Sequence, residues 1–306
     1  MPGAKVYDQT TATRLNLGSD NQIASVDFRR ADGSTGTAAG KVVVVAAHGI
    51  ETPRLLLNSK QEGASNGVAN SSDQVGRNLM DHPTRLSWAE AAEPVWPYRG
   101  PLSTSGIENL RDGDFRAQRG AFRIEIGNDG HSWPTGAPTT TAADLAMQGL
   151  RGDALNEKIK DVTSRQIRLA SLVEQSPDAN NRVTLDPDKT DANGVPLPRI
   201  HYDLDEYTRA GLDAAEAAHE EVFAAIGATN VKHAVDTQGA GHIIGTVRMG
   251  DDPSQAVVNA DQRSFDHSNL FILGSGTFPT SATANPTLTI AALSLKSVDA
   301  IAETVR

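Results

Sequence analysis

The stretch KVVVVAAHGIETPRLLLN, residues 41–58, places four valines directly before a turn and an apolar run. A strand whose apolar residues are consecutive rather than alternating is typical of a parallel sheet with both faces covered. Thr52 is predicted to cap the helix that follows, and Pro53 fits the first helical turn because no amide donor is needed there. The stretch therefore predicts an α/β fold in which a strand buried on both faces leads into a helix.

Further elements of such a fold flank this stretch on both sides. On the N-terminal side, Ile23–Phe28 alternates apolar and polar residues as a half-buried strand does, and Asp32-Gly33 is a hairpin turn signal. On the C-terminal side, Asn269–Leu273 is predicted to be a second buried strand. A final helix is predicted to start after Pro286, because proline suits the start of a helix.

The middle of the chain is predicted to hold one long helix and a few strands, among them Phe122–Ile126. Residues 205–226 carry an apolar face at helical spacing, with Asp203 or Asp205 as the capping residue. Residues 84–150 are interrupted by prolines and are predicted to be largely irregular. Two short segments are predicted to form the arms of a hairpin: residues 172–174 and 182–185.

The composition excludes several classes of function. The formal net charge of −10 argues against nucleic acid as a partner, because phosphate binding needs clustered lysine and arginine. The chain has no cysteine, which excludes disulfides, thiolate nucleophiles and cysteine-held metal clusters. No apolar run reaches the length of a membrane span. The chain is therefore expected to bind neither nucleic acid nor, through a span of its own, a membrane.

One ionisable residue stands out in the apolar stretch GAGHIIGTVRMG, residues 239–250. His242 precedes two isoleucines, and the glycines around it would let another group approach the backbone closely. Two interpretations are open. His242 is either a core histidine satisfied by a hydrogen bond or a titratable group that faces a binding site.

Three motifs, taken in chain order, carry a family likeness. They are VVVVAAHGIETPRLLLNS from residue 42, VGRNLMDHP from residue 75, and GHIIGTVRMG from residue 241 with its continuation NLFILGSGTFPTSATANPTLTIAAL from residue 269. Together they resemble the glucose–methanol–choline (GMC) oxidoreductases, flavoproteins that oxidise alcohols. Two further stretches, PVWPYRGPLSTSGIENLRDG and SPDANNRVTLDPDKTDANGVPLPRIHYDLDEYTRAG, resemble the catalytic subunits of the FAD-dependent glucose, gluconate and sorbitol dehydrogenases.

The resemblance implies a chemistry for the site. It predicts FAD as cofactor, a sugar or polyol as substrate, and hydride transfer from the alcohol carbon to flavin N5. It assigns catalytic roles to His242, as the base that takes the hydroxyl proton, and to Asn285, which orients the same oxygen. It also predicts cofactor contacts at a set of residues in four segments: Val6, Asn78, Gly274, Ser275, Gly276, Asn285, Pro286 and Thr287. No metal ligand is predicted, since no pair of histidines has metalloprotease spacing.

One family feature is missing from the sequence. The family begins with a strand, a G-x-G-x-x-G turn and a helix that hold the FAD pyrophosphate, and no such turn occurs here. The chain is therefore expected to be the C-terminal part of such an enzyme and to lack that βαβ unit. Residues 1–85 and 236–306 are predicted to form a discontinuous, partial FAD-binding layer, and residues 86–235 a substrate domain with an antiparallel sheet.

The missing turn leaves two functions open. The first is a flavin-dependent oxidoreductase acting on CH–OH groups, working with an N-terminal FAD-binding segment or an electron-transfer subunit. The second is a non-catalytic truncated product that acts as a binding or assembly partner.

Overall fold

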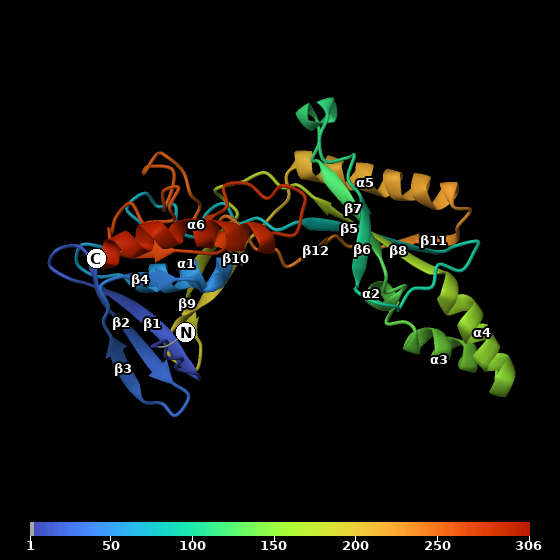
Figure 1. Cartoon of the computed structure of the whole chain (residues 1–306), viewed down its shortest axis with the longest axis horizontal. Coiled ribbons are helices and arrows are strands. Elements are labelled where there is room, and N and C mark those ends of the chain that lie inside the picture. The colour runs from blue at the N-terminus through green and yellow to red at the C-terminus, as the bar shows by residue number, and fades with distance from the viewer. Residues whose placement is uncertain (1–2) are drawn as a thin grey trace.

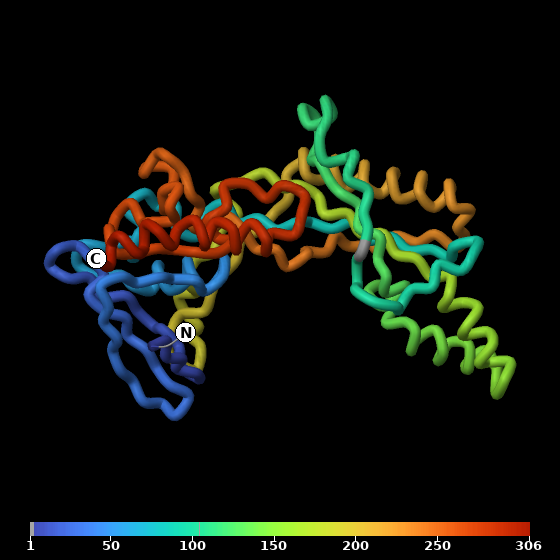
Figure 2. Tube along the Cα trace, in the orientation of Figure 1, coloured from blue at the N-terminus to red at the C-terminus, as the bar shows by residue number. Residues whose placement is uncertain are grey.

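The chain, seen here as a computed structural model that describes residues 3–306, has two parts that lie side by side along its long axis (Figure 1). One part contains the N-terminal strands and the final helix, and both ends of the described chain lie in it. The other part is built on a single antiparallel sheet. Figure 2 shows that the chain passes between the two parts more than once, so neither is one continuous segment.

The first part opens with a three-stranded antiparallel sheet in the order β1-β2-β3. The strands are β1 (Thr10–Leu17), β2 (Ile23–Arg30) and β3 (Thr35–Ala38). The predicted turn at Asp32-Gly33 joins β2 to β3: Gly33 has φ +85° and its N–H donates to the carbonyl of Arg30 at 2.9 Å. The predicted hairpin is therefore confirmed.

A parallel strand pair and two helices complete the first part. They are β4 (Val43–Val45), paired with β13 (Leu270–Ile272), and the helices α1 (His48–Asn58) and α6 (Thr287–Val305). All three residues of β13 are buried, and α6 begins directly after Pro286. Both C-terminal predictions, the buried strand and the final helix, are thus confirmed.

The prediction that the valine strand is buried on both faces is wrong. β4 spans three residues, and Val44 is 44% exposed although Val45 is buried. Among residues 3–306, β4 pairs with β13 alone, so one of its edges and one of its faces lack a neighbour. Consecutive valines indicate burial only where a sheet continues on both sides.

The predicted start of the following helix is also wrong. α1 begins at His48, and Thr52 and Pro53 lie inside it. Thr52 still accepts a hydrogen bond on its hydroxyl, from the N–H of Ala47 at 3.1 Å, but this bond closes the turn before the helix instead of capping a helix that starts at residue 53.

The second part is a six-stranded antiparallel sheet in the order β11-β5-β8-β7-β6, with β12 also paired to β5. Its strands are β5 (Pro83–Glu90), β6 (Ser103–Ile107), β7 (Phe122–Gly127), β8 (Gln166–Val173), β11 (Thr229–His233) and β12 (Gln238–Gly239). Every residue of β8 is buried, because β8 lies between β5 and β7 and both of its faces are covered.

Helix α5 (Glu206–Ala225) packs against one face of this sheet and confirms the predicted long helix. Asp205 caps it, since its carboxylate accepts the N–H of Thr208 at 2.8 Å; Asp203 does not. The other helical segments are short: η1 (Asp114–Ala117), α2 (Ser132–Thr135), α3 (Thr139–Met147), α4 (Gly152–Arg165) and η2 (Ser275–Thr277).

Two predictions for the middle of the chain are wrong. Residues 172–174 and 182–185 do not pair with each other: β8 pairs with β5 and β7, whereas β9 (Arg182–Thr190) pairs with β10 (Pro196–His201). Residues 84–150 are not largely irregular either, because three strands of the sheet and helix α3 lie there. The prolines of this region stand mostly in the connections between these elements.

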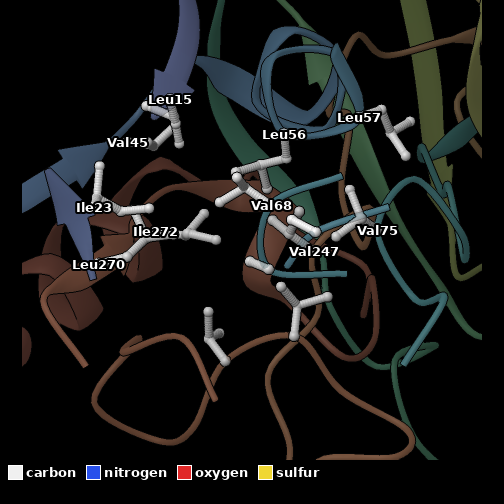
Figure 3. Packing of buried hydrophobic residues seen from close by; sticks show 14 residues of the cluster. Leu15, Ile23, Val45, Leu56, Leu57, Val68, Val75, Val247, Leu270 and Ile272 are labelled. Atoms are coloured by element: carbon white, nitrogen blue, oxygen red, sulfur yellow. The ribbon is translucent and has the colours of Figure 1, made fainter. Parts of the chain in front are cut away.

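A shared core joins segments from the two ends of the chain. Leu15 and Ile23 from the N-terminal sheet pack with Leu56 of α1 and with Leu270 and Ile272 of β13 (Figure 3). The mixed α/β fold predicted from the sequence is confirmed. Of the helices in residues 3–306, none is both long and apolar enough to cross a membrane.

Candidate active site

The candidate site lies where the segment containing His242 meets residues 78–82. Met80 and Ile244 pair as an isolated antiparallel bridge and exchange two backbone hydrogen bonds, at 3.0 and 2.9 Å. Gly245, with φ +94°, lies against the carbonyl oxygen of Asn78, and any Cβ there would overlap that oxygen. The glycine is thus required for the two segments to meet.

Asp81 holds the backbone of both histidine-bearing segments. One of its carboxylate oxygens accepts the N–H of His82 and the N–H of His242, each at 2.7 Å. The other oxygen accepts the N–H of Gly241 at 3.1 Å. A buried carboxylate that accepts several backbone amides fixes the positions of all of them.

The two imidazole rings meet edge to face. Their Nδ1 atoms lie 3.0 Å apart, the ring centroids are 5.0 Å apart and the ring planes are inclined by 83°. Nε2 of His82 lies 2.9 Å from the carbonyl oxygen of Ser281. His82 is fully buried, whereas His242 is only partly buried and lines a cavity.

Asn285 reaches His242 from the other side. Its Nδ2 lies 3.4 Å from Nε2 of His242, and its Oδ1 accepts from Nη1 of Arg123 at 3.2 Å. Arg123, on β7, also forms ion pairs with Glu108 and Glu125 at 3.1 and 3.3 Å. The prediction that His242 and Asn285 converge on one cavity is confirmed.

That cavity has a volume of about 610 Å³ and is lined by both apolar and polar residues. Besides His242 and Asn285, its lining includes charged and aromatic side chains from the sheet and from α2: Arg123, Glu125, Asp129, Arg168 and Trp133. Trp133 donates its indole N–H to Gln238 of β12 at 2.9 Å, and this hydrogen bond links the Trp133 side of the cavity to the sheet. A cavity of this size is sufficient for a small-molecule ligand.

The environment keeps both histidines neutral near neutral pH. Burial, together with the smaller effect of the neighbouring His242, lowers the pKa of His82 to about 4. Burial also lowers the pKa of His242 below its usual value, with the charges of Asp81 and Glu125 acting in the opposite direction. A neutral imidazole has a nitrogen lone pair available to accept a proton.

The predicted cofactor contacts fall in four places. Val6 is 92% exposed and outside any strand, whereas Asn78 is buried beside His242's segment and its Nδ2 donates to Gln74 at 3.3 Å. Ser275 and Gly276 are buried in η2, where the Ser275 hydroxyl donates to the carbonyl of Ile243 at 2.6 Å. Gly274, with φ +110°, has open space where a side chain would lie.

The last two predicted contacts lie at the start of α6. Pro286 is the residue before the helix, and Thr287 is its first residue. Thr287 and the next two residues are exposed. Because they lie in the first turn of the helix, their N–H groups have no carbonyl within the helix to pair with. This helix start directly follows Asn285, so its free amides lie beside the site.

Sequence reasoning assigned no role to Arg123; it placed Asp81 and His82 in a loop that resembles the family's loop over the flavin or is merely structural, and it predicted no contact of either with His242. The motif VGRNLMDHP indicated a loop near the site, but nothing in it shows that His82 would touch His242 across 160 residues. Ligand atoms of Asp81, His82 and His242 lie within 4.8 Å of one another, a spacing that a metal ion also accepts. The hydrogen bonds of the Asp81 carboxylate and of His82 account for this cluster without a metal.

The comparisons with known proteins indicate the family of the chain. Two family models described as GMC oxidoreductase match the chain, over residues 1–84 and residues 177–294. The fructose dehydrogenase large subunit of Gluconobacter japonicus is 38% identical over 299 residues, which cover 98% of this chain and 54% of that protein. The 2-methyl-1,2-propanediol dehydrogenase of Mycolicibacterium austroafricanum is 30% identical, with 85% and 48% covered. The chain thus spans about half the length of these relatives.

Solved structures share the fold at lower identity. Pyridoxine 4-oxidase from Mesorbium loti superimposes with a TM-score of 0.61 at 21% identity, over 95% of this chain and 56% of that one. Formate oxidase from Aspergillus oryzae gives 0.64 at 15% identity, over 96% and 60%. Together with the two family models and the motifs around His242 and Asn285, these likenesses show that the chain belongs to the GMC oxidoreductase family.

Proposed function

We propose that this chain carries the substrate side of an FAD-dependent dehydrogenase that oxidises a CH–OH group of a sugar or polyol. The observation that carries the proposal is the pair formed by His242 Nε2 and Asn285 Nδ2, 3.4 Å apart at the wall of one cavity. An alcohol oxygen on the cavity side, within hydrogen-bond reach of both nitrogens, would lose its proton to the histidine while the amide orients it.

The residues next to this pair fit a flavin. The exposed amides at the start of α6 and the positive end of its dipole suit the electron-rich pyrimidine edge of a reduced flavin. Gly274 leaves open space where a side chain would stand, which suits the close approach of a ribityl or phosphate chain. FAD, when bound, supplies the hydride acceptor. Asn78, Ser275, Gly276, Pro286 and Thr287 would line its site; Val6 would meet it only through its backbone.

The substrate class follows from the cavity walls. Charged side chains of both signs, together with Trp133, provide hydrogen-bond donors, acceptors and one flat apolar surface. Several hydroxyl groups on a carbon frame match such a lining better than a purely apolar alcohol does. The name of the fructose dehydrogenase relative agrees with a sugar substrate.

The chain's own residues have separate tasks in this reaction. His242 takes the hydroxyl proton on Nε2, and its lowered pKa keeps it unprotonated at neutral pH. Asn285 donates to the same oxygen without adding charge. Asp81 holds the backbone of the base, and Arg123 holds the Asn285 amide.

We also propose that residues 1–85 and 236–306 form part of an FAD-binding layer that a further segment, bearing the pyrophosphate turn, completes. Support comes from the exposed side of β4 and from three apolar residues on α6: Leu288, Leu295 and Val298 are 83%, 73% and 50% exposed. An electron-transfer subunit is a second proposed partner. Residues 86–235 form the substrate domain in this proposal, although β9 and β10 contact α1.

The test is anaerobic reduction of the flavin in the enzyme assembled with its FAD-binding segment. D-fructose, D-glucose, D-gluconate and D-sorbitol are added in turn while the flavin absorbance is followed. We expect at least one of them to bleach the flavin, and His242→Ala to abolish the bleaching. A flavin that stays oxidised with all four would leave the binding or assembly role as the better description.

A further inference from the structure

We propose that His82 is a positioning residue that holds His242 in the tautomer with a proton on Nδ1 and a lone pair on Nε2. This inference rests on the proposed function for its catalytic meaning. It is derived, however, from hydrogen bonds alone. A chain of hydrogen bonds runs through the site. The group at each of its two ends can act only as an acceptor or only as a donor.

The inner end of the chain is the carbonyl oxygen of Ser281. A carbonyl can only accept, so the nitrogen 2.9 Å away, Nε2 of His82, must carry a proton. His82 is fully buried, and burial disfavours a charged ring. A neutral imidazole has one protonated nitrogen, and the Nδ1 of His82 is therefore a bare acceptor.

The second step fixes the partner ring. Nδ1 of His242 lies 3.0 Å from Nδ1 of His82, and two bare nitrogens at this distance would repel. Since His82 can only accept here, His242 must donate from Nδ1. The lone pair of a neutral His242 is then on Nε2, the nitrogen that faces Asn285 and the cavity.

The outer end of the chain gives the same answer independently. Arg123 can only donate, so the atom of Asn285 that it contacts at 3.2 Å is the amide oxygen. The amide NH₂ of Asn285 then points toward Nε2 of His242, 3.4 Å away, and needs a lone pair there. Both ends therefore place the acceptor on Nε2. The cavity presents one acceptor and one donor side by side, which complements a hydroxyl group.

This arrangement matters because an imidazole in water prefers the opposite tautomer, with its proton on Nε2. Without an acceptor at Nδ1, His242 would present an N–H to the substrate instead of a base. Outer partners that orient a functional histidine typically change its performance by about ten- to a hundredfold. We expect a loss of this size in kcat when the acceptor is removed.

The matched variants are His82→Leu and His82→Asn. Leucine removes the acceptor. Asparagine can place its side-chain oxygen near the former Nδ1 and restore it. The direct readout is nitrogen NMR of the 306-residue chain labelled with ¹⁵N-histidine, near neutral pH and without cofactor. The signals of His242 are identified by their loss in His242→Gln, and the six histidines other than His82 and His242 report whether each variant is folded.

We expect protonated Nδ1 and unprotonated Nε2 at His242 in the wild type and in His82→Asn, with a shift toward protonated Nε2 in His82→Leu. A wild-type His242 protonated on Nε2 would overturn the inference, even if the leucine variant does not fold. An unchanged tautomer in folded His82→Leu would do so as well. In the assembled enzyme, His82→Asn should recover kcat that His82→Leu loses. If no sugar or polyol is oxidised, the proposed function fails, while the NMR result still decides this inference.

Discussion

His242 is held at three points, and each restricts a different freedom of the residue. Asp81 fixes the backbone through the amide N–H, His82 fixes the ring through Nδ1, and Asn285 lies at Nε2. Only the last of these three points faces the cavity. Substitutions at the cavity wall should therefore affect the chemistry, whereas substitutions behind the ring should affect its orientation.

Replacing the base should cost more than replacing the amide. We expect His242→Ala to lower kcat in the assembled enzyme by about 10² to 10⁴, the usual contribution of a general base. Asn285→Ala should lower kcat by about tenfold, because the amide orients the oxygen without taking its proton. Steady-state kinetics with a dye acceptor measure both. His201→Ala, at an exposed histidine outside the cavity, is the matched control. Near-normal rates for both site variants would contradict the assignment.

The pH dependence should follow the lowered pKa of His242. The base form exists above the pKa, so kcat/KM falls as the pH drops through it, and this acid limb should lie below the usual histidine value of 6.5. Glu125→Gln removes a negative charge that favours the protonated ring and should move the limb to still lower pH. A profile of kcat/KM against pH for both forms checks this. An acid limb above pH 6.5, or a shift to higher pH in the variant, would show that another group controls the rate.

At this scale the motifs revealed His242 and Asn285 but not their supports. The two residues occur in long family-like segments, so their meeting could be expected from the sequence. His82 and Arg123 act through single contacts between distant segments, at 3.0 and 3.2 Å, which depend on the exact packing of the sheet against the loops. No spacing in the sequence encodes such contacts.

At the scale of elements, the side chains of strand β8 point alternately to the two faces of the large sheet. Ile167, Leu169 and Val173 point into the apolar core with α5, whereas Arg168 and Leu172 line the cavity on the other face. β8 alternates polar and apolar residues only over Gln166–Leu169, and all of its residues are buried, so its sequence does not show the full pattern of a half-buried strand. This is why the sequence suggested only a short hairpin arm there, and why the long α5, with one solvated face, was easier to predict.

The contact between α5 and the sheet should make folding stability depend on pH. His219 on α5 is fully buried and hydrogen-bonded to Ser87 and Ser171, both at 2.8 Å, and burial lowers its pKa to about 3. Between pH 6.5 and that value, the unfolded chain binds a proton that the folded chain does not. The free energy of unfolding therefore falls with falling pH, by up to about 1.4 kcal/mol per pH unit for this one proton.

His219→Gln removes this titratable group and so tests its contribution to the pH dependence of folding stability. Above pH 6.5 both states are neutral at this position, so the pH dependence there should be unchanged by the substitution. Between pH 6 and pH 4, denaturant unfolding should show a shallower loss of stability in the variant than in the wild type. Equal slopes would show that the buried ring gains a proton in the folded state.

At the scale of the molecule, the first part presents apolar surface that nothing among residues 3–306 covers. Val44 of β4 and the exposed leucines of α6 are the clearest examples. An unpaired strand edge beside apolar side chains invites association with another chain. The four consecutive valines predicted a strand buried on both faces, and they could not show that β4 is only three residues long with one partner strand among residues 3–306.

We expect the 306-residue chain alone to bind FAD weakly and to oxidise no sugar at a useful rate. The family's glycine-rich turn supplies backbone amides to the pyrophosphate, and the free amides of α6 lie beside the catalytic pair instead. The chain should also self-associate unless a segment with that turn is added in trans. Calorimetric titration with FAD, alongside light scattering, measures both properties. Tight one-to-one binding with sugar-dependent bleaching of the flavin would refute the expectation.

The Ser281 carbonyl behind His82 also limits where a proton can travel. A carbonyl oxygen carries no proton that it could pass on, so a proton taken up by His242 cannot leave inward through His82. In the proposed reaction, a proton taken from the substrate would therefore return to water from Nε2 of His242, on the side that faces the cavity. Each turnover would then end with the oxidised product and the proton leaving in sequence on the cavity side of His242. A product that leaves slowly would keep His242 protonated and delay the next turnover.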